Sequence, residues 1–250
     1  MIIGLRGGHS ANCVGAIGIV KEYEQMQEFY KAVSGLLTSY GHTVIDCNSN
    51  GANANIELSE GAIKSNNAKV DIFISLHMNA FDGSANGVET LVSSANSKAI
   101  SYATKLCDNF SLLGFKNRGV KFEKLYEMNH VNAPNIIFEL CFCDSRTDMA
   151  IYYNCNWTTL AYRFCNAVDS NVPITPPTDS KGYVVTNYLP PDSEKYDGVN
   201  INSILEYFKG VVCYVRGDSK GVWVETQYLP LNKCNELKDT LGSWFYKIKI

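Results

Sequence analysis

The sequence predicts an α/β domain built on a mostly parallel sheet, followed by a small α+β domain. Strand-like and helix-like segments alternate through residues 1–170, proline-rich residues 171–182 interrupt the pattern, and residues 183–250 follow the order βαββαβ. Repeated strand–helix units give a parallel sheet with helices on both faces. We therefore expect two domains, 1–170 and 183–250, joined by a linker at 171–182.

The first domain is expected to begin with a strand at residues 2–5. A helix over 22–40 follows from apolar residues that recur every three or four positions, and Gly41 is expected to end it. The apolar run 135–142 is typical of a strand that is covered on both faces. The remaining strands are expected at 42–47, 70–76 and 87–93, and the remaining helices at 56–68, 98–113 and 144–168, the last of which Asn154 could interrupt.

The second domain follows three prolines within 171–182, which predict a semi-rigid linker. Its two middle strands are interpreted as a hairpin, and Gly217-Asp218 is a strong signal for the turn between them. The strands are expected at 183–188, 211–216, 222–228 and 245–250, and the helices at 200–208 and 233–241.

Composition argues against several classes of protein. Lys and Arg number 22 against 25 Asp and Glu, and no basic stripe occurs, so neither nucleic acid nor a membrane surface is an expected partner. No apolar run reaches the roughly 18 residues of a membrane span. The amino terminus lacks the features of a signal peptide, and we expect synthesis in the cytoplasm. The nine cysteines are irregularly spaced, which favours reduced thiols in the core.

Two histidines and a glutamate are candidate metal ligands. His9 and His77 each follow a strand-like run, and functional side chains gather where the strands of an α/β sheet end. Glu22 lies four residues before Met26 and shares its core-facing stripe, whereas Glu24 lies on the wetter face of the same helix. Two imidazoles and one carboxylate form a ligand set that suits catalytic zinc and leaves a position for water.

Glu139 is the candidate general base. It lies between two apolar stretches, where an unpaired carboxylate is costly unless it has a partner such as a metal ion. Burial would raise the pKa of this carboxyl and a nearby cation would lower it, and the sequence leaves both outcomes open. The other two histidines, His42 and His130, are interpreted as structural.

Short motifs of the first domain recur in a recognisable order: Gly8-His9, Glu22, and residues 76–80, 87–90, 117–120 and 138–144. With these motifs, residues 1–168 resemble the zinc N-acetylmuramoyl-L-alanine amidases of bacterial autolysins and phage endolysins. The resemblance implies a six-stranded, mainly parallel sheet, and zinc bound by His9, Glu22 and His77. It also implies that Glu139 is the catalytic carboxylate, and that the substrate is the amide between N-acetylmuramic acid and L-alanine in bacterial peptidoglycan.

The same resemblance assigns two further residues to the substrate. Asn79, just after the second histidine, would hold substrate or orient the site. Arg118 would meet a carboxylate of the stem peptide or form a structural ion pair. Arg6-Gly7 departs from the Asp-Pro pair that the family often has before Gly-His, which affects the surroundings of the ligands and not the ligands themselves.

The order of elements in the second domain is similar to the SPOR peptidoglycan-binding repeat. Its aromatic residues Tyr188, Trp223, Tyr228 and Trp244 would stack on sugar rings or fill the small core. An RNA-recognition module has the same order of elements, but the neutral charge of this domain argues against it.

The leading hypothesis is a phage endolysin that acts on the bacterial cell wall after its release from the cytoplasm. Two alternatives stay open. One is a zinc peptidase that cuts within the stem peptide, and the other is a non-enzymatic protein that binds the wall or nucleic acid.

Overall fold

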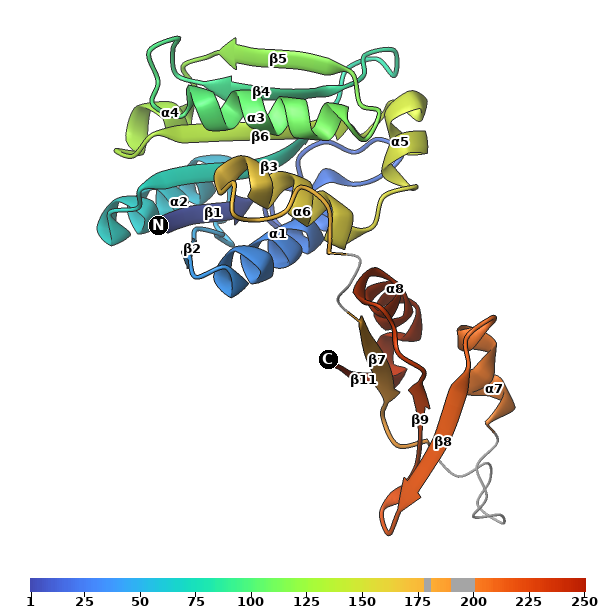
Figure 1. Cartoon of the computed structure of the whole chain (residues 1–250). Coiled ribbons are helices and arrows are strands. Elements are labelled where there is room, and N and C mark those ends of the chain that lie inside the picture. Colours follow the sequence, from blue (N-terminus) through green and yellow to red (C-terminus); the bar gives the residue numbers. More distant parts are fainter. Residues whose placement is uncertain (178–180, 190–200) are drawn as a thin grey trace. The chain divides into compact units, whose positions relative to one another are not determined.

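The chain divides into two compact units in the computed structural model, which describes residues 1–177, 181–189 and 201–250. The first unit is Met1–Thr175 and the second is Pro176–Ile250 (Figure 1). In the described part of the chain, no helix combines the length and the apolar character that crossing a membrane requires.

The first unit is built on a six-stranded sheet with the strand order β2-β1-β3-β6-β4-β5 (Figure 1). Neighbouring strands run parallel, except that β4 and β6 are antiparallel. The predicted mostly parallel six-stranded sheet is therefore confirmed. Its strands are β1 (Ile2–Gly7), β2 (Thr43–Asp46), β3 (Ile72–Asn79), β4 (Val88–Val92), β5 (Asn117–Phe122) and β6 (Asn135–Phe142).

Helices cover both faces of this sheet. On one face pack α1 (Glu22–Ser39), α3 (Ile100–Ser111) and α6 (Trp157–Val168), and on the other α2 (Ala54–Ala68) and α4 (Tyr126–His130) (Figure 1). The main core lies under the first group, because the sheet and those helices carry most of the fully buried apolar side chains. Four aromatic rings at its centre contact one another: Phe29, Phe110, Phe138 and Phe164.

The strand predicted at 135–142 is confirmed, whereas the helix predicted over 144–168 is two helices, α5 (Arg146–Tyr152) and α6. The interruption covers residues 153–156 and so includes Asn154, where the sequence suggested a break. Asn156 begins the second helix, because its side-chain oxygen accepts a hydrogen bond from the Thr159 backbone N–H at 2.8 Å.

Two elements of the first unit are absent from the sequence predictions. The strand β5 lies at the edge of the sheet, and its residues are exposed or half-buried, so it lacks a clear alternation of apolar and polar residues. The helix α4 has only five residues, which is too short to show a helical period.

The proline-rich stretch differs from the predicted linker at both ends. Val172 is fully buried and packs in the core of the first unit, because the chain stays on that core beyond α6. Lys181 and Gly182 pair with a neighbouring strand and so belong to the second unit. Residues 178–180 of this stretch lie outside the described residues.

The second unit packs an antiparallel sheet against helices. The predicted order βαββαβ is confirmed with one short extra strand, β10, while Asn200, where the first helix was expected to begin, lies outside the described residues. The elements are β7 (Lys181–Thr186), α7 (Asn202–Leu205), a 3₁₀ turn (Glu206–Phe208), β8 (Cys213–Asp218), β9 (Gly221–Thr226), β10 (Leu229–Pro230), α8 (Leu231–Leu241), a 3₁₀ turn (Gly242–Trp244) and β11 (Phe245–Lys249).

The predicted hairpin of the two middle strands is confirmed, but its turn lies two residues later than the predicted Gly217-Asp218. Asp218 still belongs to β8 and pairs with Gly221, which leaves Ser219 and Lys220 as the turn. The Asp218 carboxylate accepts a hydrogen bond from the Lys220 backbone N–H at 2.8 Å. Gly221 has a φ of 148°, which glycine adopts without strain, and this fixes where the return strand starts.

The aromatic centre of the first unit gives a stability prediction. Phe110→Ala is expected to lower the free energy of unfolding by about 3–5 kcal/mol, because it leaves a cavity among packed rings. Phe122→Ala is the matched control, since its side chain is 52% exposed, and it should change stability by less than about 0.5 kcal/mol. Urea denaturation checks both, and equal losses for the two variants would contradict this packing.

Candidate active site

His9 lies in the turn that follows β1. Its backbone has a φ of 71°, a left-handed conformation that histidine adopts more readily than most residues. The preceding Gly8 donates its N–H to the carbonyl of Leu76 on the neighbouring strand β3, at 2.6 Å. The end of β1 is thereby fixed beside the end of β3, which carries His77.

Glu22 is the first residue of α1 and is almost completely buried. One carboxylate oxygen accepts hydrogen bonds from His77 Nδ1 at 2.8 Å and from the Met78 N–H at 3.0 Å. The other accepts the Ala16 N–H at 2.7 Å and lies 3.1 Å from His9 Nε2. Burial raises the pKa of Glu22, but hydrogen bonds to His77 and His9 outweigh it and hold that pKa well below its usual range.

The metal-ligating atoms of His9, Glu22 and His77 all lie within 4.8 Å of one another. The two imidazole rings meet edge to face, with their centroids 4.9 Å apart. Two glycines make room for this arrangement, since a Cβ on Gly8 would collide with His77 and one on Gly15 with His9 and Glu22. Two imidazole nitrogens and one carboxylate that converge in this way fit a zinc ion.

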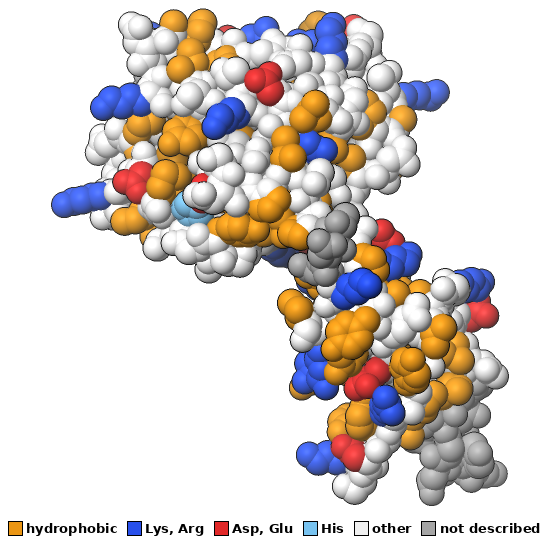
Figure 2. Space-filling model, viewed as in Figure 1, with side chains coloured by type: hydrophobic (Ala, Val, Ile, Leu, Met, Phe, Trp, Pro, Cys, Tyr) orange, Lys and Arg blue, Asp and Glu red, His pale blue; other side chains and the backbone are white. Residues whose placement is uncertain are grey.

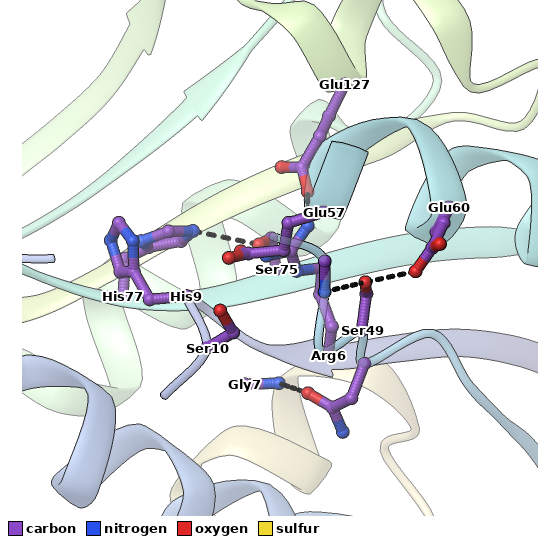
Figure 3. A network of polar contacts seen from close by, with 12 residues as sticks. Arg6, Gly7, His9, Ser10, Ser49, Glu57, Glu60, Ser75, His77 and Glu127 are labelled. Carbon is purple, nitrogen blue, oxygen red and sulfur yellow. Dashed lines mark hydrogen bonds and ion pairs between the residues drawn. The ribbon is translucent and has the colours of Figure 1, made fainter. Parts of the chain in front are cut away.

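Ser75 fixes the orientation of the His77 ring. Its hydroxyl lies 2.9 Å from His77 Nε2, two residues along the same face of β3 (Figure 3). The opposite ring nitrogen, Nδ1, is therefore the one that faces Glu22. Ser75 is fully buried, so the contact is shielded from water. A hydrogen bond to the distal nitrogen is the usual way in which proteins orient a metal-binding histidine.

A buried ion-pair network lies beside these residues, on the face covered by α2 and α4 (Figure 3). Arg6 is 1% exposed and pairs with Glu57 of α2 and, at 3.1 Å, with Glu127 of α4. Arg6 is also the register partner of Ser75, so the network borders the residue that orients His77. The sequence marked Arg6 as unusual but gave no sign of its two partners, which lie 51 and 121 residues away.

Glu139 lies on β6, directly opposite His77 on β3. Its buried Oε2 has no hydrogen-bond partner among the described residues. The pKa of this carboxyl is raised to about 7: burial is the main cause, His77 opposes it, and the charges of Glu22 and Glu89 add to the rise. The sequence did not decide whether the pKa of Glu139 is raised or lowered. When no metal is bound, the effect of burial on this pKa outweighs the effect of the nearby histidine.

Asn79 and Arg118 meet at a residue that the sequence analysis did not assign to the site. Glu89 accepts a hydrogen bond from Asn79 Nδ2 at 2.8 Å and one from Arg118 Nε at 2.7 Å. It lies on β4 directly opposite Glu139, so His77, Glu139 and Glu89 form a row across β3, β6 and β4. The motif at 87–90 contained Glu89, but only the strand pairing shows that it adjoins Glu139.

The two remaining histidines have ordinary structural contacts. His42 Nε2 lies 3.0 Å from a carboxylate oxygen of Asp169, and His130 Nδ1 lies 2.8 Å from the carbonyl of Tyr126. Neither is part of the cluster formed by His9, Glu22 and His77.

Comparison with known proteins relates this site to one family. Residues 3–170 match the family model described as N-acetylmuramoyl-L-alanine amidase. An uncharacterised protein of Clostridium perfringens is 37% identical over 157 residues, which are 61% of this chain and 47% of the relative. The endolysin of Bacillus phage SPP1 is 28% identical over 158 residues, 60% of this chain and 58% of the relative. The chain thus spans about half the length of the curated relatives that it matches.

A solved structure extends the likeness to the fold. The catalytic domain of the CD27L endolysin, which targets Clostridia difficile, aligns with a TM-score of 0.63 and 30% identity, over 70% of this chain and 99% of that domain. The family match covers the same segment that carries His9, Glu22, His77 and Glu139. The chain belongs to the N-acetylmuramoyl-L-alanine amidase family.

Proposed function

We propose that the first unit is a zinc-dependent peptidoglycan hydrolase. It cleaves the amide between the lactyl group of N-acetylmuramic acid and the L-alanine of the stem peptide. The observation that carries this proposal is the convergence of two imidazoles and one carboxylate within 4.8 Å, next to a buried Glu139 oxygen that has no hydrogen-bond partner within the described part of the chain. The match of residues 3–170 to the amidase family supports the bond that is cleaved.

His9, Glu22 and His77 would hold the zinc ion. Zinc bound there would polarise the amide carbonyl and make its water a better nucleophile near neutral pH. Glu139 would act as general base and then as general acid, because its carboxyl lies beside the cluster with a free oxygen. Its Oε2 takes a proton from the attacking water and passes it to the alanine nitrogen as the carbon–nitrogen bond breaks.

For the second unit we propose a role in binding the cell wall. Its helices cover one face of the sheet, and a hollow of about 260 Å³ is lined by residues of β7, β9 and β11 and the chain after β7. Tyr188, Trp223 and Tyr246 supply aromatic surface to this hollow, and its charged lining residues are Lys247, Lys249 and Glu225. Hydrophobic and basic side chains also lie intermixed on the face of this unit seen in Figure 2. Aromatic surface of this kind suits stacking on sugar rings.

The sequence suggested two roles for four aromatic residues of the second unit, stacking on sugar rings or filling its small core, and the four residues differ in which role they fit. Tyr188 and Trp223 line the hollow, and Tyr228 is 60% exposed. Trp244 packs against the core of the second unit, so it fills that core instead.

A wall-binding unit beside a hydrolase would raise the local concentration of the catalyst at its polymer. We propose that the whole protein is an endolysin, made in the cytoplasm and active on the wall after release.

Digestion of isolated peptidoglycan tests the bond specificity. The zinc-loaded protein is expected to release peptides with a new L-alanine amino terminus and to leave the glycan chains intact, and a chelator should stop the reaction. Mass spectrometry of the fragments gives the answer. Cleavage within the stem peptide would instead support the zinc peptidase, and no cleavage of any bond would support a purely binding protein.

Two substitutions separate metal binding from proton transfer. Glu139→Gln should lower wall hydrolysis by about a thousandfold, because the general base is lost, and should leave the zinc content at one ion per chain. His77→Ala should lose the metal itself. Zinc analysis and turbidity loss of purified walls measure both effects. Glu24→Gln and His130→Ala are the matched controls, and a Glu139→Gln protein as active as wild type would exclude the proposed role.

The pKa of Glu139 predicts how the stability of the metal-free protein depends on pH. Burial raises that pKa from 4.5 to about 7, which corresponds to about 3 kcal/mol. The folded protein holds the extra proton between these values, so stability falls as pH rises through this window. Glu139→Gln should therefore be more stable than wild type near pH 8 and similar near pH 4. Urea denaturation at the two pH values checks this, and a difference independent of pH would contradict it.

A further inference from the structure

The two ring nitrogens of His77 have different neighbours. Nδ1 lies 2.8 Å from Glu22 Oε1, and Nε2 lies 2.9 Å from the hydroxyl of Ser75. An ionised carboxylate only accepts hydrogen bonds, so in these contacts the single proton of a neutral imidazole is on Nδ1. Nε2 then offers a lone pair, and the Ser75 hydroxyl donates its proton to it.

Binding of a metal ion through Nδ1 requires the opposite tautomer of His77. The coordinating nitrogen carries no proton, so the one proton that the neutral ring keeps is then on Nε2. Ser75 Oγ has to accept this proton, and the hydroxyl proton of Ser75 needs a new acceptor. Ser75 is fully buried, so bulk water does not reach it. A buried hydroxyl proton without an acceptor would disfavour the metal-bound tautomer.

The ion-pair network of Arg6 contains two free acceptors. Glu57 and Glu127 each use Oε1 for the arginine, and the Oε2 of each is buried with no hydrogen-bond partner in the described part of the chain. Figure 3 shows Ser75 between His77 and Arg6, and the two acids converge on that arginine. Buried oxygens without partners are uncommon in folded proteins, so this pair calls for a physical explanation.

Arg6 holds the two acids beside Ser75. It is the register partner of Ser75 on the neighbouring strand, and its guanidinium joins α2 to α4. Gly61 of α2 leaves the room that the arginine needs, since a Cβ there would lie 3.4 Å from Arg6 Nη1 and 3.0 Å from the Cys47 carbonyl oxygen. The position of the free oxygens is therefore fixed by three elements, β1, α2 and α4.

We propose that Glu57 and Glu127, held by Arg6, are positioning residues for the metal ligand His77. A free oxygen of this pair accepts the hydroxyl proton of Ser75 when a metal ion binds Nδ1, and this favours the tautomer of His77 with its proton on Nε2. The network thereby strengthens zinc binding without contacting zinc. This inference rests on the proposed function, because it concerns the zinc ion assigned there to His77.

The zinc dissociation constant tests this proposal and is measured by competition with a chromogenic chelator. Ser75→Ala is expected to weaken zinc binding by about 10–100-fold, because the distal nitrogen of His77 loses its partner. At least one of Glu57→Gln and Glu127→Gln should weaken it by about tenfold. The amide keeps its oxygen toward Arg6 and turns its NH₂ group, which is only a donor, toward Ser75.

Nitrogen NMR of histidine-labelled protein shows the tautomer directly. We expect the proton of His77 on Nδ1 in the metal-free wild type and on Nε2 in the zinc-loaded wild type. A proton on Nδ1 in the zinc-loaded protein would overturn the proposal, because zinc would then be bound through Nε2 and Ser75 would not be the partner of the distal nitrogen.

Ser65→Ala and Glu60→Gln are the matched controls. Ser65 is buried like Ser75, but its hydroxyl has no partner within the described residues, and Glu60 is an exposed acid of the helix that carries Glu57. Both variants should keep the wild-type zinc dissociation constant.

Urea denaturation of the metal-free proteins separates positioning from folding. A merely structural role of the network would lower the stability of the two amide variants and leave their zinc dissociation constants unchanged, and that result would overturn the proposal. An unchanged constant in Ser75→Ala would overturn it as well. A wild type that binds no zinc would instead refute the proposed function itself.

Discussion

The site depends on one buried carboxylate. Glu22 is 3% exposed, and a charge at that depth is tolerated only when hydrogen bonds replace the water it has lost. Its four neighbours come from different parts of the chain: the loop after β1, the residues before α1, and the end of β3. The same contacts that satisfy this carboxylate bring His9 and His77 together. The fold therefore assembles the ligand cluster whenever it buries the first turn of α1.

Strand pairing extends the site sideways from that cluster. Because β6 runs parallel to β3 and antiparallel to β4, Glu139 has His77 on one side and Glu89 on the other. One neighbour favours a negative charge on Glu139 and the other opposes it. A single row of side chains thus carries the proposed zinc ligand His77, the proposed general base Glu139, and Glu89, which accepts hydrogen bonds from Asn79 and Arg118. The helices α2 and α4 cover this face near Arg6, where the buried ion pairs lie.

The sequence predicts the elements and site residues that a local pattern marks. It does not predict contacts that form only when distant strands and helices come together. The apolar run of β6 and the ends of strands that carry His9 and His77 are local, and each is visible in a short window. Glu89 shows its place only when β4 pairs with β6, and the partners of Arg6 come from two distant helices. The edge strand β5 lacks an apolar period because half of its surroundings are solvent. The turn lies after Asp218 and not at Gly217-Asp218, because the ladder between the two strands continues to the pair of Asp218 with Gly221, which a short window of sequence does not show.

The ion pairs of Arg6 have an evolutionary consequence. One guanidinium is enclosed with two carboxylates, and an oxygen on each of these has no partner among the described residues. Exchange of either acid for its amide would leave a matched pair of opposite charges, whereas loss of the arginine would confine two like charges together without water. Natural variation in this lineage should therefore fall on the acids first. A change at the arginine would need replacements of both acids as well, in α2 and α4, so the arginine is expected to vary least of the three positions.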